Sequence, residues 1–497
     1  MSDIKIREEK IKAKRMQTPR REFLKEISSR LSLLYYKNSG LVSRYPETDR
    51  VKGVMPFKEF EEMDSSQFWI EFDANKSFFE NYFALIKNMD IPNLIHYSNT
   101  ENASFSDVIL LSKNVYLSNT VITDCENVLY SLNVKEYSKN VINSIQVRNN
   151  SENIYFSKWV IESFKIFYSK YIYNSSNIRF STNLAWCSEC ILCNDLENQS
   201  YCIKNKKYEK AEYQRMKEHI LHEKSKFLWY YKDATNIWAN FGSANVKGNF
   251  VQHSENVENW YYGYQLKDCR NILLFGWIGT NTNMCDVVSG GSGTNSDFFG
   301  MISCWANAQN LYTSSNVTWS SSVFYSYFLR DCSYCIGCVG LKNKSFCILN
   351  KEYTKEERFT LVNKIFEQMD KDWTLWQFFP WWMNPFYFND TAACLIDDSF
   401  TKEEVAKAGY LRRDGEIKVD IPKWAEVIEV KDLKNYQRTN FQWTREINPE
   451  ILKKVIRDEK WNYYRIVKME YDFLMKHALP LPELHRLERI KLGFKFK

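Results

Sequence analysis

The sequence predicts a mainly β protein built as two tandem parallel β-solenoid (β-helix) lobes, and three observations support this. A marker, Asn followed by a β-branched residue, recurs every 12–13 residues. The recurrence appears in two runs, and each run ends in the same cysteine-rich block. A unit of this length holds one or two short strands and a turn, and it is too short for a helix pair. The alternative is a pair of antiparallel β-sandwiches with accidental periodicity.

The markers of the two runs keep the same phase. Their spacings are 13, 13, 13, 12, 12 and 13 residues in the first run and 15, 13, 13, 13, 12 and 13 in the second. Asn and Ser at a turn position suit a left-handed backbone, and stacked Asn side chains can pair their amides. We therefore expect parallel coils over about 100–205 and 240–350, with one or two units in each coil. The markers are Asn114, Asn127, Asn140, Asn153, Lys165, Asn177 and Cys190, then Asn256, Asn271, Met284, Asp297, Asn310, Ser322 and Cys335.

This pattern divides the 497 residues into four segments. Residues 1–95 form a basic α+β flank, 96–225 the first lobe with its cap helix, 226–372 the second lobe with its cap helix, and 373–497 an aromatic cap segment followed by a basic helical module. The N-terminus has no apolar h-region and no run approaches 18 apolar residues, so neither a signal peptide nor a membrane span is expected. Thirteen cysteines without an export signal indicate reduced thiols or metal ligands, and hence the cytoplasm.

A cysteine block ends each run of repeats. Both copies show C-x2-C-x2-C-x8-C, then Ile-x-Asn-Lys-x-Tyr-x-Lys, displaced by 145 residues. Four thiolates at this spacing could hold Zn²⁺ or an iron–sulfur cluster. Cysteines at this spacing within a coil can equally be small, buried apolar residues, and we favour free thiols with no cofactor. The candidate metal ligands are Cys187, Cys190, Cys193, Cys202, Cys332, Cys335, Cys338 and Cys347.

A helix is predicted after each block, near 208–224 and 354–370. Thr354 and Glu357 match the capping-box pattern at the start of the second helix. An amphipathic helix here would cover an end strand that is otherwise unpaired and prone to aggregation. The apolar faces are Tyr213, Met216 and Ile220 in the first copy, and Phe359, Val362, Phe366 and Met369 in the second.

The segment from Asp331 to Glu357 reads D-C-x2-C-x-G-C-V-G-L-K-N-K-x-F-C-I-L-N-K-E-Y-T-K-E-E. Together with "FFPWWMNPFYFNDTAACL" and "FTKEEVAKAGY", it resembles an uncharacterised cysteine-rich repeat family of candidate-phyla (Patescibacteria) bacteria. The resemblance covers nearly the whole chain and implies zinc-ribbon-like modules at both ends. No cysteine lies before Cys125 or after Cys394, so those terminal zinc sites are expected to be lost.

Positive charge is concentrated at the two ends of the chain. Residues 1–30 hold ten Lys and Arg against five Asp and Glu, and residues 451–497 hold twelve against six. We therefore expect RNA or a ribonucleoprotein as partner, whereas the alternative is a solvated helix and a frayed tail. The candidate nucleic-acid-binding residues are Lys10, Lys12, Lys14, Arg15, Arg20, Arg21, Arg486, Arg489, Lys491, Lys495 and Lys497.

The functional prediction is a non-catalytic binding or scaffold protein with no membrane association. The alternative is a carbohydrate-active β-helix enzyme, which rests on analogy of fold alone. Such an enzyme needs two carboxylates that converge on one groove, and the sequence shows no recognisable acid–base pair. No catalytic residue is assigned, and whether one solenoid face gathers charged residues in a groove would discriminate the two hypotheses.

Overall fold

The computed structural model describes residues 20–492 except 27, 224–225, 234–243, 245–246, 253–257, 265–272, 276–280, 291–294, 305–306, 376, 415–420, 422, 424 and 440–444. Only the backbone is described for the strands between 247 and 304. The chain forms two compact units, Met1–Ile95 with Trp238–Arg413 and His96–Ile237 with Asp414–Lys497. Each unit therefore joins segments that the four-segment division of the sequence treats separately.

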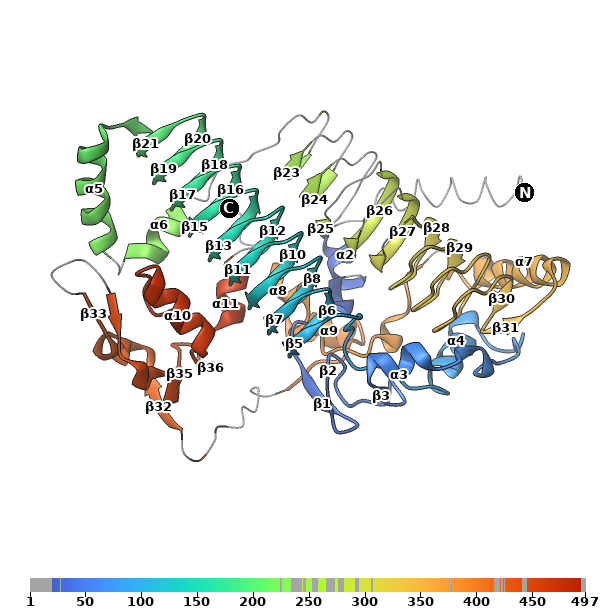
Figure 1. Ribbon diagram of the computed structural model, residues 1–497. Coiled ribbons are helices and arrows are strands. Elements are labelled where there is room, and N and C mark those ends of the chain that lie inside the picture. The colour runs from blue at the N-terminus through green and yellow to red at the C-terminus, as the bar shows by residue number, and fades with distance from the viewer. Residues whose placement is uncertain are drawn as a thin grey trace. The chain divides into compact units, whose positions relative to one another are not determined.

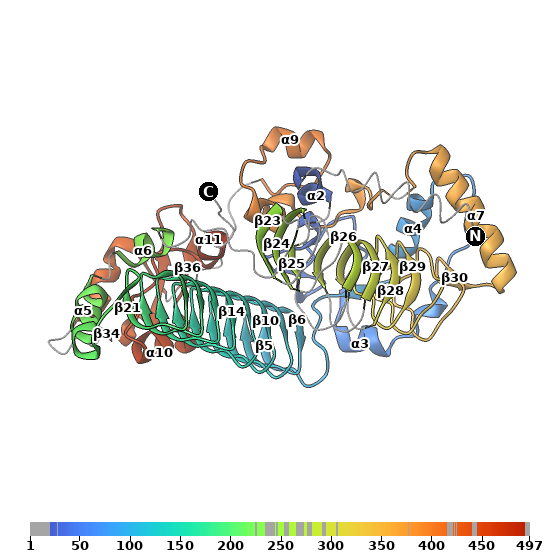
Figure 2. The same cartoon turned by 90° about the horizontal axis from the view of Figure 1, so that it is seen from above.

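A parallel β-solenoid forms the larger part of the second unit, as predicted (Figures 1 and 2). Its strands alternate between an eight-stranded sheet with the order β20-β18-β16-β14-β12-β10-β8-β6 and a ten-stranded sheet that runs from β22 and β21 to β5. The bounds are β5 Glu101–Ser104, β6 Asp107–Leu110, β7 Lys113–Tyr116, β8 Asn119–Ile122, β9 Glu126–Leu129, β10 Leu132–Lys135, β11 Lys139–Ile142, β12 Ile145–Arg148, β13 Glu152–Tyr155, β14 Lys158–Ile161, β15 Phe164–Phe167, β16 Lys170–Tyr173, β17 Ser176–Arg179, β18 Thr182–Ala185, β19 Ser188–Ile191, β20 Asn194–Glu197, β21 Ser200–Ile203 and β22 Lys206–Lys207.

One repeat unit makes one complete coil, which resolves the question of one or two units. Val134 pairs with Val147, and Val160 pairs with Ile172, so each inward residue meets its equivalent exactly one repeat further along the chain. The backbone is left-handed at every third residue, with φ values of 57° at Asn127, 51° at Tyr130 and 58° at Asn133. The longer coils contain one pair of consecutive left-handed residues, such as Thr123 with Asp124. This extra residue explains why two spacings occur in the sequence.

The residue after each left-handed position points into the solenoid. Aliphatic and serine side chains alternate there, as in Val128, Ser131 and Val134, all 0% exposed. Each serine is satisfied within the stack. The Ser144 hydroxyl donates to the Ile142 carbonyl at 2.9 Å and accepts the Ser157 N–H at 3.1 Å. Two apolar columns and two serine columns therefore fill the interior without leaving these buried hydroxyls unpaired.

The first-run markers Asn114, Asn127, Asn140 and Asn153 form a side-chain ladder, as the sequence predicted for stacked Asn residues. The side-chain amides of Asn102, Asn114, Asn127 and Asn140 each donate to the next Asn, at distances of 2.8, 2.9, 2.9 and 3.5 Å, ending at Asn153. The assignment of Cys190 and Cys335 as the last markers is wrong by one residue. The left-handed positions are Glu189 and Tyr334, and Cys190 pairs with Ile178 of the inward column. The markers Asn256 and Asn271 lie outside the described residues.

Two helices and a C-terminal group of elements complete the second unit. The helices are α5 Lys210–His222 and α6 Phe227–Asp233. The C-terminal elements are β32 Glu426–Glu429, η6 Val430–Tyr436, β33 Gln437–Thr439, β34 Arg445–Ile447, η7 Pro449–Lys453, β35 Lys454–Arg457, β36 Tyr463–Tyr464, α10 Lys468–Lys476 and α11 Arg486–Lys491. We call them the C-terminal module. It packs on outward aromatic residues of the solenoid: the ring of Phe473 stacks on Tyr155 with centroids 5.9 Å apart.

The first unit combines N-terminal elements, a second run of parallel strands and the helix after the second cysteine block. The sheet order β23-β24-β25-β26-β27-β28-β29 is parallel throughout, and parallel bridges continue the coils to Ile336↔Ile348. The bounds are α2 Arg20–Glu26, η1 Ser28–Arg30, β1 Tyr36–Asn38, β2 Leu41–Ser43, β3 Val54–Met55, α3 Phe57–Glu62, η2 Ser65–Gln67, α4 Phe78–Ile86, β4 Ile91–Pro92, β23 Lys247–Gln252, β24 Glu258–Tyr264, β25 Leu273–Phe275, β26 Asn281–Gly290, β27 Asn295–Cys304, β28 Gln309–Tyr312, β29 Ser321–Phe324, β30 Cys347–Ile348, β31 Lys351–Glu352, α7 Lys355–Lys371, η4 Trp381–Met383, η5 Phe388–Asp390, α8 Ala392–Ile396 and α9 Lys402–Lys407.

Aromatic contacts and a buried ion pair hold the first unit together. Phe78 of α4 packs against Tyr325 of the coils, with ring centroids 5.3 Å apart. The buried Asp390 accepts from Arg413 at 2.9 Å and from the Tyr36 hydroxyl at 2.7 Å. The capping box of Thr354 with Glu357 at the start of α7 is confirmed. None of the helices in the described part of the chain combines the length and apolar character that a membrane crossing requires.

Candidate functional site

A recess of about 520 Å³ lies within the second unit, between the first solenoid coils and the C-terminal module. We call it the tyrosine–arginine pocket. Its volume falls within the range of about 300–1,000 Å³ that is typical of small-molecule sites. The lining residues are Tyr116, Leu117, Tyr130, Leu452, Tyr463, Tyr464, Arg465, Ile466, Val467, Lys468, His485, Arg486 and Arg489.

The charge of the tyrosine–arginine pocket is one-sided. Its described lining includes four Lys or Arg side chains and no Asp or Glu. Arg489 contacts Glu470 at 2.9 Å, and Lys468 pairs with Asp472 one turn along α10. The exposed Arg465 donates to the Leu452 carbonyl at 3.0 Å. The pocket is therefore suited to an anion.

Tyrosines supply the opposite side of the tyrosine–arginine pocket. Tyr116 and Tyr130 come from consecutive coils, and their rings meet edge to face with centroids 5.8 Å apart. Burial raises the pKa of Tyr116, while the nearby Arg486 and Arg465 act in the opposite direction. The phenol is neutral at pH 7 and offers a flat ring and one donor.

A histidine and a buried ion pair shape the inner end of the tyrosine–arginine pocket. Burial, together with Arg486 and Arg489, lowers the pKa of His485 to about 3, so its ring is neutral at pH 7. Its Nδ1 accepts the Leu487 N–H at 3.4 Å as the N-cap of α11, which assigns the proton to Nε2. The Arg489–Glu470 pair is almost fully buried, with side chains 2% and 0% exposed, and Arg489 also lies over the Tyr130 ring.

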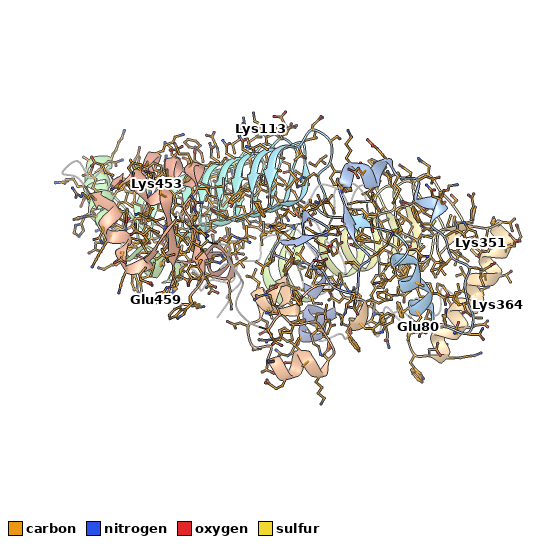
Figure 3. All side chains as sticks on the ribbon, turned by 90° about the horizontal axis from the view of Figure 1, so that it is seen from below. Glu80, Lys113, Lys351, Lys364, Lys453 and Glu459 are labelled. Atoms are coloured by element: carbon orange, nitrogen blue, oxygen red, sulfur yellow. The ribbon has the colours of Figure 1, made fainter. Side chains whose placement is uncertain are left out.

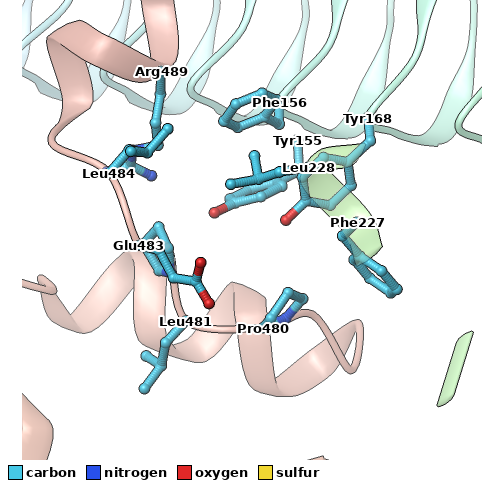
Figure 4. A pocket seen from close by; sticks show the side chains of 11 residues that line it. Tyr155, Phe156, Tyr168, Phe227, Leu228, Pro480, Leu481, Glu483, Leu484 and Arg489 are labelled. Atoms are coloured by element: carbon cyan, nitrogen blue, oxygen red, sulfur yellow. The ribbon is translucent and has the colours of Figure 1, made fainter. Parts of the chain in front are cut away.

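A second cavity of about 30 Å³, the inner pocket, shares Arg489 with the tyrosine–arginine pocket. Figure 4 shows the hydroxyls of Tyr155 and Tyr168 and the carboxylate of Glu483 around this space. The Tyr155 hydroxyl and Arg489 Nε have no hydrogen-bond partner among the described residues. The volume suits one or two water molecules, and ordered water commonly satisfies buried polar atoms of this kind. The inner pocket is too small for an organic ligand.

The cysteine blocks occupy inward positions of the last coils in both units. Cys187, Cys190 and Cys193 each follow a left-handed residue, so the x2 spacing is the spacing of consecutive inward side chains. Cys202 pairs with Cys190 one coil later, which accounts for the x8 spacing. The second block repeats this arrangement at Cys332, Cys335, Cys338 and Cys347. All eight side chains are at most 2% exposed.

The thiols of the two blocks bond mainly to carbonyl groups. Cys193 Sγ donates to the Ile191 carbonyl at 3.3 Å, and Cys338 Sγ donates to the Ile336 carbonyl at 3.4 Å, as the serines of the same columns do. Hydrogen bonds to neighbouring thiols and burial raise the pKa of Cys190 and of Cys335, so both are protonated. The described residues contain no group of three or more His, Cys, Asp or Glu placed to hold a metal ion. The eight block cysteines and Cys125 are free thiols.

The predicted nucleic-acid-binding residues fall into three groups. Lys10, Lys12, Lys14, Arg15, Lys495 and Lys497 lie outside the described residues, and of Arg20 only the backbone is described. Arg21 is engaged within the first unit, where it pairs with Glu404 at 2.5 Å and with Asp397 at 3.1 Å. Arg486 and Arg489 line the tyrosine–arginine pocket, and Lys491 ends α11 beside them in the sequence.

Four important pocket residues were not singled out from the sequence: Tyr116, Tyr130, Arg465 and Lys468. The two tyrosines belong to the repeats "SKNVYLS" and "CENVLYS", where an outward aromatic residue looks like ordinary strand composition. The two cations lie in the C-terminal run that the charge count flagged as a whole. Their convergence requires contact between segments far apart in the sequence, which periodicity does not encode.

Comparison with known proteins identifies no related protein. No family model, no curated protein and no solved structure matches the chain. The resemblance to a cysteine-rich repeat family of Patescibacteria therefore stays a prediction.

Proposed function

We propose that this protein is a non-catalytic binding protein, a cytoplasmic scaffold whose β-solenoid holds a site for an anionic partner, RNA or a ribonucleoprotein. The observation that supports this proposal is the tyrosine–arginine pocket, with four cationic lining residues and no carboxylate among those described. Cations and flat aromatic rings together suit single-stranded nucleic acid, because guanidinium groups contact phosphate and bases stack on aromatic rings.

The solenoid supports this proposal by keeping the pocket rigid. Tyr116 and Tyr130 sit on adjacent coils whose strands pair in register, with Tyr116 opposite Leu129. The buried Arg489–Glu470 pair joins α11 to α10 within the C-terminal module, and the module contacts the solenoid through Arg489 over the Tyr130 ring and through His477 Nε2, which lies 3.2 Å from Asn153 Oδ1 of the Asn ladder. Side chains held on rigid elements keep a binding geometry with little ordering cost.

We also propose that the chain consists of two tandem solenoid lobes, each ended by its cysteine block and a cap helix. The helices α5 and α7 approach their coils with equivalent residues, since Tyr213 and Arg358 are 145 positions apart. Tyr213 is buried with its ring centroid 5.6 Å from that of Tyr201, and Arg358 Nε donates to the Tyr334 carbonyl at 3.0 Å. Covering the last strand in this way would prevent edge-to-edge association.

Binding of single-stranded RNA to the full chain tests the proposed function. Fluorescence anisotropy with a labelled single-stranded RNA should show affinity that falls steeply with salt, by about 0.7 in the log–log slope for each phosphate neutralised. The double variant Arg465→Gln, Lys468→Gln should lower both affinity and slope. A matched control is Lys434→Gln, Lys453→Gln, which removes the same charge from exposed positions of the C-terminal module outside the pocket lining (Lys453 in Figure 3).

Deletion variants show which part of the chain binds RNA. Removing residues 1–19 tests the N-terminal basic stretch, and loss of binding in this variant alone would assign the RNA contact to that stretch. Trimming at the C-terminus must stop before α11, because Arg489 and Ile490 are buried there. Absence of RNA affinity in the wild-type chain at low salt would overturn the proposal.

A further inference from the structure

The two walls of the tyrosine–arginine pocket differ in chemistry. The solenoid contributes Tyr116, Leu117 and Tyr130, which carry no charge at pH 7. The C-terminal module contributes all four cations of the described lining. A ligand that fits both walls must be planar and largely apolar on one side and anionic on the other. A free inorganic anion would contact only the cationic wall, and a neutral aromatic compound would contact only the tyrosine wall.

The cationic wall is suited to a phosphate group. Arg465 and Arg486 present guanidinium groups, which bind phosphate oxygens in a bidentate manner. Both arginines line the same pocket as Tyr116 and Tyr130. The nine-residue helix α10 begins at Lys468, and its N-cap residue Val467 makes no side-chain capping hydrogen bond. The first backbone N–H groups of α10 thus add donors and positive helix-dipole potential at the same place.

The size of the pocket restricts the ligand further. A space of about 520 Å³ holds a small molecule of a few fused or linked rings but not a folded polynucleotide. Aromatic residues favour a flat heterocycle, and each base stacked on an aromatic side chain contributes about 1–3 kcal/mol. A single nucleotide combines such a base with a phosphate a few bonds away.

We infer that the tyrosine–arginine pocket binds one nucleoside phosphate, with the base against Tyr116 and the phosphate at Arg465, Lys468 and Arg486. This inference rests on the proposed function and names the ligand class of the same site. The nucleoside phosphate is a free mononucleotide or the phosphorylated end of an RNA strand, and both present the same chemistry to the pocket.

Isothermal titration calorimetry on the full-length protein tests the inference. The probes are the four ribonucleoside 5′-monophosphates, the four corresponding nucleosides and ribose 5-phosphate. At least one mononucleotide should bind, and its nucleoside and its sugar phosphate should each bind at least about 10-fold more weakly, because each engages one wall only. A 5′-phosphorylated RNA hexamer that competes with the mononucleotide, where its 5′-hydroxyl form does not, identifies the strand end as a ligand.

Variants separate the two walls. Tyr116→Leu should weaken mononucleotide binding by about 5- to 100-fold while leaving ribose 5-phosphate unaffected. Arg465→Gln, at an exposed position, should weaken binding of the mononucleotide and of ribose 5-phosphate but not binding of the nucleoside. The control Tyr137→Leu removes a tyrosine that is 53% exposed and lies outside the pocket lining, and it should change nothing. If Tyr116→Leu fails to fold, Arg465→Gln still decides the question.

The outcomes distinguish this inference from the proposed function. Salt-dependent RNA binding that the pocket variants leave unchanged would refute the nucleoside-phosphate site and keep the binding function. No mononucleotide binding at millimolar ligand, or equal affinity for nucleotide, nucleoside and sugar phosphate, would also overturn the inference. Failure of both RNA and mononucleotide binding would overturn both proposals.

Discussion

Replacing Ser144 by alanine removes one oxygen atom, yet it should clearly destabilise the solenoid of the second unit. The Ser144 side chain lies in the interior, 0% exposed, in one of the two serine columns. Its hydroxyl makes two hydrogen bonds, one to the Ile142 carbonyl at 2.9 Å and one from the Ser157 N–H at 3.1 Å. Removing the hydroxyl leaves only one of these two partners without a hydrogen bond. The Ile142 carbonyl keeps the N–H of Phe156 at 3.1 Å, whereas the Ser157 N–H loses its acceptor.

The expected cost follows from this unpaired donor. A buried donor left without a partner costs about 1–3 kcal/mol, so Ser144→Ala should lower the free energy of unfolding by about 2 kcal/mol. Ser144→Cys should cost less than about 1 kcal/mol, because a thiol still donates and accepts weakly. Thiols already occupy the serine columns at Cys125 and Cys193. Cys193 Sγ donates to a carbonyl at 3.3 Å and accepts the Asn205 N–H at 3.4 Å.

Urea unfolding followed by circular dichroism measures these differences. The control is Ser176→Ala on strand β17, where the side chain is half-buried and outside the inward columns, and its effect should stay within about 0.5 kcal/mol. The order of stability should be wild type, Ser144→Cys, then Ser144→Ala. A loss for Ser144→Ala no larger than that of the control, or equal losses for Cys and Ala, would refute the idea that the serine columns stabilise by accepting buried N–H groups.

Three further predictions concern titration, thiols and the buried ion pair. Burial and nearby Lys476 and Arg179 lower the pKa of His477 to about 4, so the unfolded chain binds more protons there. The contribution of His477 to stability should therefore be complete above about pH 6.5 and fall by up to about 3 kcal/mol towards pH 4, on top of the loss from His485, and His477→Gln should remove this part of the loss in acid unfolding curves. Elemental analysis should find less than one metal per cysteine block, and a bulky thiol reagent should reach the eight thiols only after unfolding; stoichiometric zinc or iron would reverse this preference. Glu470→Gln should cost about 3–5 kcal/mol by leaving the Arg489 charge buried without its partner, whereas Glu450→Gln, which breaks an exposed pair, should cost less than about 1 kcal/mol in the same assay.

Much of the solenoid could be predicted from sequence because its contacts are local and repeated. A residue in one coil meets its equivalent one repeat later, so spacing alone indicates parallel stacking. The Asn ladder and the capping box of α7 belong to the same class of short-range patterns. The register error at Cys190 and Cys335 has a related cause. The true marker Glu189 lies 12 residues after Asn177, and the inward Cys190 lies 13 residues after it. Both spacings occur in the repeats, so spacing alone does not distinguish the two residues.

One side chain in every three residues points into the solenoid, and this period of three is also visible in the sequence. The spacing C-x2-C-x2-C is one instance of it, as is the alternation of valine and serine around Ser131 and Val134. A period of three is uncommon for strands, whose side chains normally alternate with a period of two. Left-handed backbone at Asn, Tyr and Glu positions alike produces this period, and such a conformation is rarely expected of residues other than Gly, Asn and Asp.

The sequence by itself determined the repeat, the parallel coils and the places where each run of coils ends. The tertiary structure alone decided which segments share a unit and where the candidate site lies. Tyr116 and Arg486 become neighbours because apolar residues of the C-terminal module, such as Phe473 and Leu474, bury themselves against outward aromatic residues of the solenoid. Hydrophobic burial is non-directional and depends on area, so no local pattern specifies which distant surface a module will cover. The tyrosine–arginine pocket forms where the C-terminal module covers the solenoid.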